Sequence, residues 1–332
     1  MGILKILELL FWSISGVFWI VGLLIFFRKL IQLVERIPKS RKHIEYFDND
    51  FLSENFLVHK KGWYKDGLAT GNWKINQNKQ CLFERGDFSQ GLKVGFWESF
   101  YEKQYLSECG NFIQGYKDGV WEYFYENGYL KKKGEYHLDK EVGVWEFYHN
   151  NGKLEQKGSF QNGKQEGFWE FYDINGQVVA KGSFSNGEQN DCWELYQNNG
   201  LLQGRGNLLN GKMNGTWETF KENGQLWMKG SYLNGERDGV WEDYHENGQL
   251  SSKGSFLNGK ETGVWVGYHE NGNFQSQSTF KEGIHIDGIY MEYHENGRLW
   301  IKGYYLNGEK DGIWEQYNED GVLVDKVNHS SN

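Results

Sequence analysis

The stretch GVWEDYHENGQLSSKGSFLNGKET, from Gly239 to Thr262, decides the fold, because close copies of it recur along most of the chain. We call its Trp241 the anchor and count positions in each repeat from that residue. Anchors recur every 24 residues at Trp73, Trp97, Trp121, Trp145, Trp169, Trp193, Trp217, Trp241 and Trp265, and after one inserted residue at Tyr290 and Trp314. Such a period over eleven units predicts a repeat protein, whose units are stable only when packed against one another.

A turn signal lies inside each unit. Asn-Gly occupies positions 6 and 7 in most repeats, as in Asn247-Gly248. This pair is preferred in two-residue type I′ turns, where both residues need a positive φ. We therefore expect each unit to be a β-hairpin that turns at this pair, with positions summing to thirteen opposite one another.

The predicted register brings complementary side chains together. Glu at position 1 faces Lys or Arg at position 12, as in Glu242 and Lys253, and each such pair contributes about 0.2–1 kcal/mol. The anchor faces Gly at position 13, so its indole can cover a residue without a side chain.

Strand alternation then predicts two faces. Leu at position 9 and an aromatic residue at position 15 share the anchor's face, whereas the aromatic residue at position 3 lies with the charged pairs. The polar segment between hairpins, residues 233–239, is expected to be a loop.

The N-terminal part has a different character. Residues 9–27 contain no charge, and 19 residues at about 1.5 Å each approach the roughly 30 Å thickness of a bilayer core. A cleaved signal peptide and a buried helix are alternatives, but Glu8 offsets Lys5, and no small-residue cleavage site follows. We expect a retained transmembrane helix. The basic residues that follow it, beginning with Arg28 and Lys29, place the repeats in the cytoplasm.

The predicted fold class is an all-β elongated array of stacked antiparallel β-hairpins, preceded by one transmembrane α-helix. The expected parts are a membrane anchor (1–30), a basic juxtamembrane linker (31–48), a degenerate capping repeat (49–72), the tandem repeats (73–324) and a polar tail (325–332).

The pattern G-x-W-E-x-Y-x-x-N-G-x-L-x-x-K-G-x-Y-x-N-G-K resembles the MORN repeat, specifically the bacterial MORN-variant repeats of the YwqK-type antitoxin family. The resemblance covers about residues 57–324. It implies an extended sheet of stacked hairpins that works by contact, in protein interaction, membrane association or a phospholipid-linked role. It also implies an antitoxin-like or immunity-like component whose protein partner could be a toxin.

Other functional classes are disfavoured. The net charge of −9 argues against nucleic-acid binding. Cys81, Cys109 and Cys192 occupy different repeat positions, which favours reduced thiols over a disulfide ladder or metal box. His149, His245, His269 and His294 all lie at position 4, but about 10 Å between repeats is too far for a shared zinc ion. We predict turn-flanking histidines, no metal, no cofactor, no small-molecule substrate and no enzymatic activity.

The candidate binding residues are tyrosines at position 3: Tyr148, Tyr172, Tyr196, Tyr244, Tyr268 and Tyr293. Ordered rows of Tyr, Glu and Lys would form a recognition face for a protein partner. The alternative is that these rings only cover neighbouring strands. Two irregular sites, Asp191-Cys192 and residues 282–287, are expected to be bulges or partner contacts. A module lying on lipid and an exported surface protein are the competing functional hypotheses.

Overall fold

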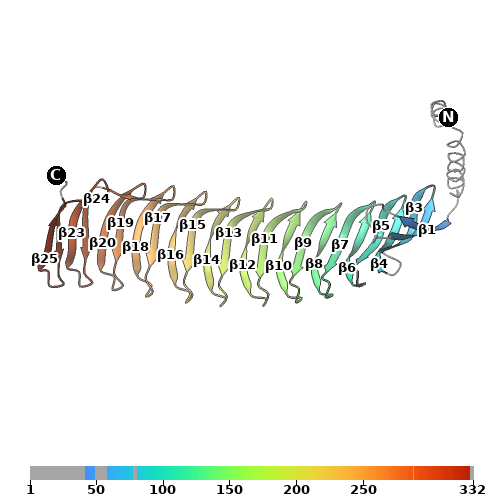
Figure 1. The fold of residues 1–332 in the computed structure, drawn as a ribbon, viewed down its shortest axis with the longest axis horizontal. Coiled ribbons are helices and arrows are strands. Elements are labelled where there is room, and N and C mark those ends of the chain that lie inside the picture. The colour runs from blue at the N-terminus through green and yellow to red at the C-terminus, as the bar shows by residue number, and fades with distance from the viewer. Residues whose placement is uncertain (1–41, 49–57, 78–80, 287, 330–332) are drawn as a thin grey trace, which may run out of the picture. The chain divides into compact units, whose positions relative to one another are not determined.

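The structure, a computed structural model, describes residues 42–48, 58–77, 81–286 and 288–329. It consists of antiparallel strands joined by short turns (Figure 1). The chain divides into two compact units, one ending at Tyr116 and one beginning at Lys117. The predicted transmembrane helix lies outside the described residues. In the ranges that the structure does describe, no helix has the length and apolar character needed to cross a membrane.

The first unit is a row of sequentially paired antiparallel strands. They are β1 (Lys42–Asp48), β2 (Val58–Lys65), β3 (Leu68–Gln77), β4 (Cys81–Ser89), β5 (Leu92–Phe100) and β6 (Leu106–Ile113). Residues 42–48 were predicted to belong to the linker, and this part of the prediction is wrong. They pair with β2 along their whole length, as between Ile44 and Gly62, because an edge strand offers backbone groups to any adjacent extended segment.

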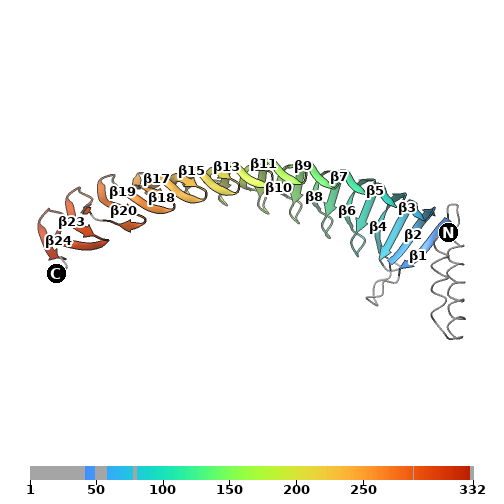
Figure 2. The ribbon, with the colours of Figure 1, turned by 90° about the horizontal axis from the view of Figure 1, so that it is seen from above.

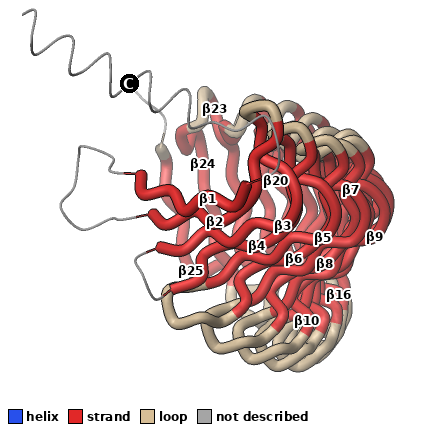
Figure 3. Tube along the Cα trace, turned by 90° about the vertical axis from the view of Figure 1, so that its right-hand side faces the viewer, coloured by secondary structure: helices blue, strands red, loops and turns tan. Residues whose placement is uncertain are grey.

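The second unit continues the same pattern of strands joined by short turns over nine further hairpins, with β21 as an additional short strand (Figure 3). Its strands are β7 (Tyr116–Phe124), β8 (Leu130–His137), β9 (Lys140–Tyr148), β10 (Leu154–Gln161), β11 (Lys164–Tyr172), β12 (Val178–Ser185), β13 (Glu188–Tyr196), β14 (Leu202–Leu209), β15 (Lys212–Phe220), β16 (Leu226–Leu233), β17 (Glu236–Tyr244), β18 (Leu250–Leu257), β19 (Lys260–Tyr268), β20 (Phe274–Lys281), β21 (Ile284–His285), β22 (Gly288–Tyr293), β23 (Leu299–Leu306), β24 (Glu309–Tyr317) and β25 (Leu323–Asn328). Within this unit the strands lie side by side in chain order (Figures 1 and 2). The prediction of an elongated, all-β stack of antiparallel hairpins is confirmed.

The C-terminal end differs from the prediction. Residues 325–332 were expected to be a polar tail, but β25 continues to Asn328 and pairs with β24, as between Lys326 and Glu315. The last hairpin therefore has two full strands. Its outer edge is formed by a strand whose side chains are all exposed.

The predicted strand register is confirmed. In the hairpin of β17 and β18, Trp241 lies opposite Gly254, and Glu242 lies opposite Lys253. The same pairing of anchor with glycine holds in β9 with β10 and in β11 with β12. Positions that sum to thirteen therefore face one another near the anchor.

The turn inside the hairpin is not the predicted type I′ turn. Gly248 has a positive φ, but Asn247 does not. The amide of Gly248 donates to the carbonyl of His245 at 3.0 Å, and the amide of His245 donates to the carbonyl of Gln249 at 2.8 Å. This is the pattern of a three-residue loop, a type I turn followed by a glycine in the left-handed region.

A bulge next to this loop restores the register. Tyr244 pairs with Leu250, whereas Asp243 pairs with Ser252, so Ser251 has no direct partner across the ladder. Because of this extra residue, the side chains between the bulge and the turn point to the face of the sheet opposite to the one that simple alternation predicts. Leu250 at position 9 therefore shares a face with Tyr244, and its predicted placement on the anchor's face is wrong.

The type I′ turns occur between repeats instead. Asn234 and Gly235 have φ values of 52° and 93° and connect β16 to β17, with Leu233 opposite Glu236. Residues 236–239, predicted to be loop, belong to β17. Gly239 has a φ of 76° at a second bulge, which explains why glycine recurs two residues before the anchor.

The anchors form the core of this single-layer sheet. Among the described residues, the tryptophans at 73, 97, 121, 145, 169, 193, 217, 241 and 314 are all at most 5% exposed. Trp145 lies over Gly134, the position 13 glycine of the preceding repeat, and not over the glycine it pairs with: a Cβ on Gly134 would fall within its ring. The same contact is made by the tryptophans at 73, 97, 169, 193, 217, 241 and 314. Trp145 also packs edge-on against Tyr136 and Phe160, at centroid distances of 5.0 and 6.0 Å. Such pairs contribute about 0.5–1.5 kcal/mol each beyond area burial.

Candidate binding face

The face opposite the anchors carries a ladder of ion pairs that runs between repeats as well as within them. Glu146 lies 2.9 Å from Lys133 of the preceding repeat and 3.0 Å from Lys157 of its own repeat. Glu242 is held in the same way between Lys229 and Lys253, at 2.9 Å each. The predicted pairing of acidic and basic rows is confirmed, and the ladder also ties adjacent repeats together.

These contacts lower the pKa values of the ladder glutamates. The hydrogen bond from Lys133, with further ones from Tyr148 and Lys157, lowers the pKa of Glu146 to about 2. Lys229 and Lys253 likewise lower the pKa of Glu242 to about 2. These carboxylates are charged at neutral pH, so the face presents charges that are paired with one another.

The tyrosine row lies on this same face, as predicted, and its residues are half-buried. Tyr148 donates its hydroxyl hydrogen bond to Glu146 at 2.7 Å, and Tyr244 donates to Glu242 at 2.8 Å. Tyr172 and Tyr196 make the corresponding bonds to the glutamates two residues before them, at 3.0 and 2.5 Å. Burial, followed by the adjacent glutamate, raises the pKa of these four tyrosines. Their hydroxyls support the ladder.

Tyr268 and Tyr293 lie where the ladder is interrupted. Position 1 is Val266 in one repeat and Met291 in the next, so neither tyrosine has the usual glutamate beside it. Phe274 lies between the two rings, with centroid distances of 6.3 Å to Tyr268 and 5.2 Å to Tyr293. The interruption replaces fixed charges with an aromatic and thioether surface.

The position 4 histidines flank the turns, as predicted, and they also link repeats. His149 Nε2 lies 3.0 Å from the backbone carbonyl of Tyr172, one repeat further on. His245, His269 and His294 make the equivalent contact at 2.7, 2.7 and 2.9 Å. A carbonyl oxygen can only accept a hydrogen bond, so each Nε2 carries a hydrogen and donates it. The loop asparagines act in parallel, as where Asn151 donates to the carbonyl of Ile174 at 2.8 Å.

A row of exposed apolar side chains was missed by the sequence reasoning. The residue directly before the anchor is between 49% and 66% exposed at Val120, Val144, Phe168, Val240, Val264, Ile289 and Ile313. We call these seven residues the apolar row. They alternate with the anchors along the strand and therefore share the face of the ion-pair ladder. Their signal was visible in the sequence, because an apolar residue stands between Gly and the anchor in most repeats.

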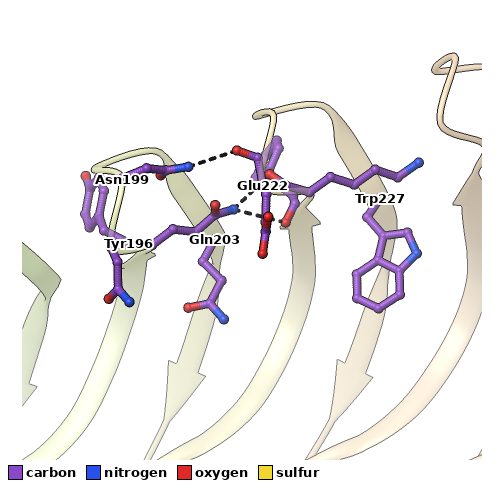
Figure 4. A pocket seen from close by; sticks show the side chains of 9 residues that line it. Tyr196, Asn199, Gln203, Glu222 and Trp227 are labelled. Atoms are coloured by element: carbon purple, nitrogen blue, oxygen red, sulfur yellow. Dashed lines mark hydrogen bonds between the residues drawn. The ribbon is translucent and has the colours of Figure 1, made fainter.

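A groove of about 570 Å³ opens at the turn end of the strands between two neighbouring repeats (Figure 4). Tyr196 and Gln203 line it from one repeat, and Phe220, Glu222 and Trp227 line it from the next. Trp227 is 50% exposed, in contrast to the buried anchors.

The irregular sites have local explanations. Asp191, which replaces the usual glycine, has a φ of 58° and lies at the same bulge, so the predicted bulge is confirmed there. The extra residue near 282–287 interrupts a strand: β21 ends at His285, and the amide of Ile286 donates to the carbonyl of Thr279 at 2.9 Å. His285 fills the space beside Tyr305, at a centroid distance of 4.2 Å, and its burial lowers its pKa.

The described ranges contain no cluster of side chains suited to metal binding. No group of three or more His, Cys, Asp or Glu side chains is placed there to hold a metal ion. Cys109 is buried and Cys192 is exposed.

The repeats match a known family. Seven segments fit the MORN repeat variant: residues 117–137, 141–162, 213–234, 237–258, 261–282, 286–307 and 310–330. These repeats are MORN repeat variants. The MORN-variant segments all lie in the second unit, and the repeats anchored at Trp169 and Trp193 between them have the same turns and the same indole-over-glycine contact. No curated protein matches the chain.

Proposed function

We propose that this MORN-variant chain is a scaffold that binds a protein partner through the face carrying the apolar row and the ion-pair ladder. The observation that carries the proposal is the apolar row itself: solvent-facing Val, Phe and Ile side chains recur at one position in a run of three repeats and, after Cys192 and Thr216, in a run of four. Isolated exposed apolar residues need no explanation, but their recurrence at one position on one face favours an interaction surface.

The neighbouring ladder makes this face selective. Its charges are already paired within the sheet, so a partner meets fixed positions instead of flexible free side chains. Pre-organised surfaces lose less conformational entropy on binding. The tyrosine rings that were predicted to bind now have a supporting role at four positions, and Tyr268 and Tyr293 remain the two best placed to touch a partner.

The membrane part of the proposal rests on the sequence. The uncharged residues 9–27 and the basic cluster after them support a single-pass anchor that keeps the repeats in the cytoplasm. The resemblance to YwqK-type antitoxins supports an antitoxin-like or immunity-like role, with a toxin as the bound protein.

Partner capture tests the binding face. Phe168→Ser and Val240→Ser, combined in the full-length chain, should abolish cross-linking to a partner that the unmodified chain captures. Leu209→Ser with Leu257→Ser is the matched control, because these leucines are similarly exposed, at 47% and 58%, but lie at the turns between repeats. Equal capture by both double variants would show that the apolar row is not the binding face.

Extraction from membranes tests the anchor separately. The full-length chain should resist alkaline carbonate, and replacing Val17 and Ile20 by Arg should release it, since a charge at the centre of a span costs about 2.5–3.5 kcal/mol on insertion scales. Protease treatment of intact cells should leave the repeats uncut. Cleavage in intact cells would instead favour an exported surface protein.

A further inference from the structure

We propose that the groove between Tyr196 and Trp227 binds a proline-rich segment in the polyproline II conformation, with an arginine directed at Glu222. This inference deepens the proposed function and rests on it only in that the partner is a protein. The groove lies at the turn end of the strands, whereas the apolar row lies beside the anchors, so the two surfaces can be tested independently.

The lining of the groove fits such a ligand. Tyr196, Phe220 and Trp227 line the groove together with Gln203. Figure 4 shows Tyr196 and Trp227 at opposite ends of the group, with Gln203 and Glu222 between them. Grooves lined by aromatic side chains recognise polyproline II segments, because proline rings pack flat on them and the preformed helix loses little entropy on binding. The indole of Trp227 is 50% exposed and so is available to a ligand.

The spacing of the repeats matches the ligand. Two strands per repeat, each about 4.8 Å wide, give roughly 9.6 Å between equivalent positions. One turn of a polyproline II helix contains three residues and advances about 9.3 Å. A segment lying across the strands would therefore offer the same edge to each successive repeat. An extended β-strand, with a period of two residues, would not keep this phase.

The same set of residues recurs further along the unit. Tyr268, Gln275, Tyr293, Glu295 and Trp300 occupy the repeat positions of Tyr196, Gln203, Phe220, Glu222 and Trp227, three repeats later. Among the described tryptophans of the second unit, only Trp227 and Trp300 are exposed, at 50% and 39%. Three repeats span about 29 Å, or roughly nine residues of polyproline II.

The charges select a basic ligand. Lys221, at the edge of the groove, is already engaged: its Nζ donates to the carbonyl of Tyr244 at 3.0 Å and lies 3.4 Å from Glu246. Glu222 is exposed, and among the described residues no cation lies within ion-pair distance of it. An arginine placed every third residue of the ligand would follow the edge that faces Glu222 and Glu295.

Fluorescence anisotropy with a labelled RPPRPPRPPRPP peptide tests the proposal on the full-length chain in detergent. We expect saturable binding that weakens about tenfold in Trp227→Ala and further in the double variant with Trp300→Ala. Glu222→Gln should weaken binding less and reduce its salt dependence. Trp63→Ala is the matched control, because Trp63 is as exposed as Trp300, at 39%, but lies outside both residue sets. The circular dichroism of each variant checks that the sheet persists.

Several results would overturn the proposal. Absence of peptide binding, unchanged binding in Trp227→Ala, or equal binding of RAARAARAARAA, which has the same charges without proline, would each do so. Binding of cellohexaose in place of the peptide, lost in Trp227→Ala, would identify a sugar site instead. None of these outcomes bears on the apolar row, whose failure would appear only in the partner-capture experiment.

Discussion

The indole Nε1 of Trp169 donates a hydrogen bond to the backbone carbonyl of Ser159 in the preceding repeat, at 3.2 Å. The same ring lies over Gly158, the residue next to Ser159. Trp169 is thus covalently part of one repeat but packs on and bonds to its neighbour, and Trp97, Trp145, Trp193, Trp241 and Trp265 donate the same bond. Stability in such an array resides largely between repeats, as expected where one hairpin alone cannot bury a core.

Gly158→Ala should destabilise the second unit by about 1–3 kcal/mol, because its Cβ would fall within the indole of Trp169 and force the ring away. Ser159→Ala is the matched control. It keeps the backbone carbonyl that Trp169 uses and should change stability by no more than about 0.5 kcal/mol. Urea unfolding followed by circular dichroism measures both, and equal midpoints would refute the packing argument.

Leu138→Asn should stabilise the chain by roughly 0.5–1 kcal/mol. Leu138 has a φ of 50° in the turn between β8 and β9, where most other repeats have Asn, and a leucine in this region is strained. The reciprocal change Asn162→Leu, at the equivalent turn with a φ of 53°, should destabilise by a similar amount. Thermal unfolding of the two variants should shift in opposite directions. Shifts of the same sign would exclude turn strain as the cause.

The strand register could be predicted because it rests on chemistry that repeats. The opposition of Glu242 to Lys253, and of Trp241 to Gly254, follows from matching rows of complementary residues, whatever the turn. The turn types could not be assigned from Asn-Gly alone, since the pair occurs twice per repeat. The Asn at position 6 serves through its side chain, as Asn247 does on the carbonyl of Glu270, whereas Asn234 serves through its backbone conformation.

The candidate face was predicted only in part. The tyrosines and charged rows were placed together correctly, because strand alternation fixes the side of each position. The bulge at Ser251 could not be foreseen, so Leu250 was assigned to the wrong face. The groove beside Trp227 was missed for a related reason. It forms where residues at the bulge of one repeat meet the loop of another, which a pattern within one repeat does not show.

Acid should weaken the fold through the ladder glutamates. Lys229 and Lys253 lower the pKa of Glu242 to about 2, against roughly 4.3 in an unfolded chain, so its contribution is present above about pH 4.5 and is lost as the pH falls toward 2. Glu242→Gln should therefore be less stable than the unmodified chain at pH 7, and the gap should close near pH 2. Glu246→Gln, at a site 80% exposed, is the control and should show no such gap. A gap independent of pH would contradict the ion-pair account.

Removing single hydroxyl groups should distinguish tyrosines that stabilise the ion-pair ladder from those that lie where the ladder is interrupted. Tyr244→Phe deletes the hydrogen bond to Glu242 at 2.8 Å and should cost about 1 kcal/mol or more, because the acceptor is charged. Tyr268→Phe should leave stability nearly unchanged, since Val266 occupies the glutamate position and no hydrogen bond of the Tyr268 hydroxyl occurs among the described residues. Chemical unfolding gives the two stabilities, and partner capture gives their binding. If Tyr244→Phe unfolds earlier but captures the partner normally, its ring and hydroxyl serve the sheet. If the Tyr268→Phe chain is stable but fails to capture the partner, the Tyr268 hydroxyl contacts the partner. If both variants lose the same amount of stability, the Tyr244 hydroxyl does not stabilise the sheet through Glu242.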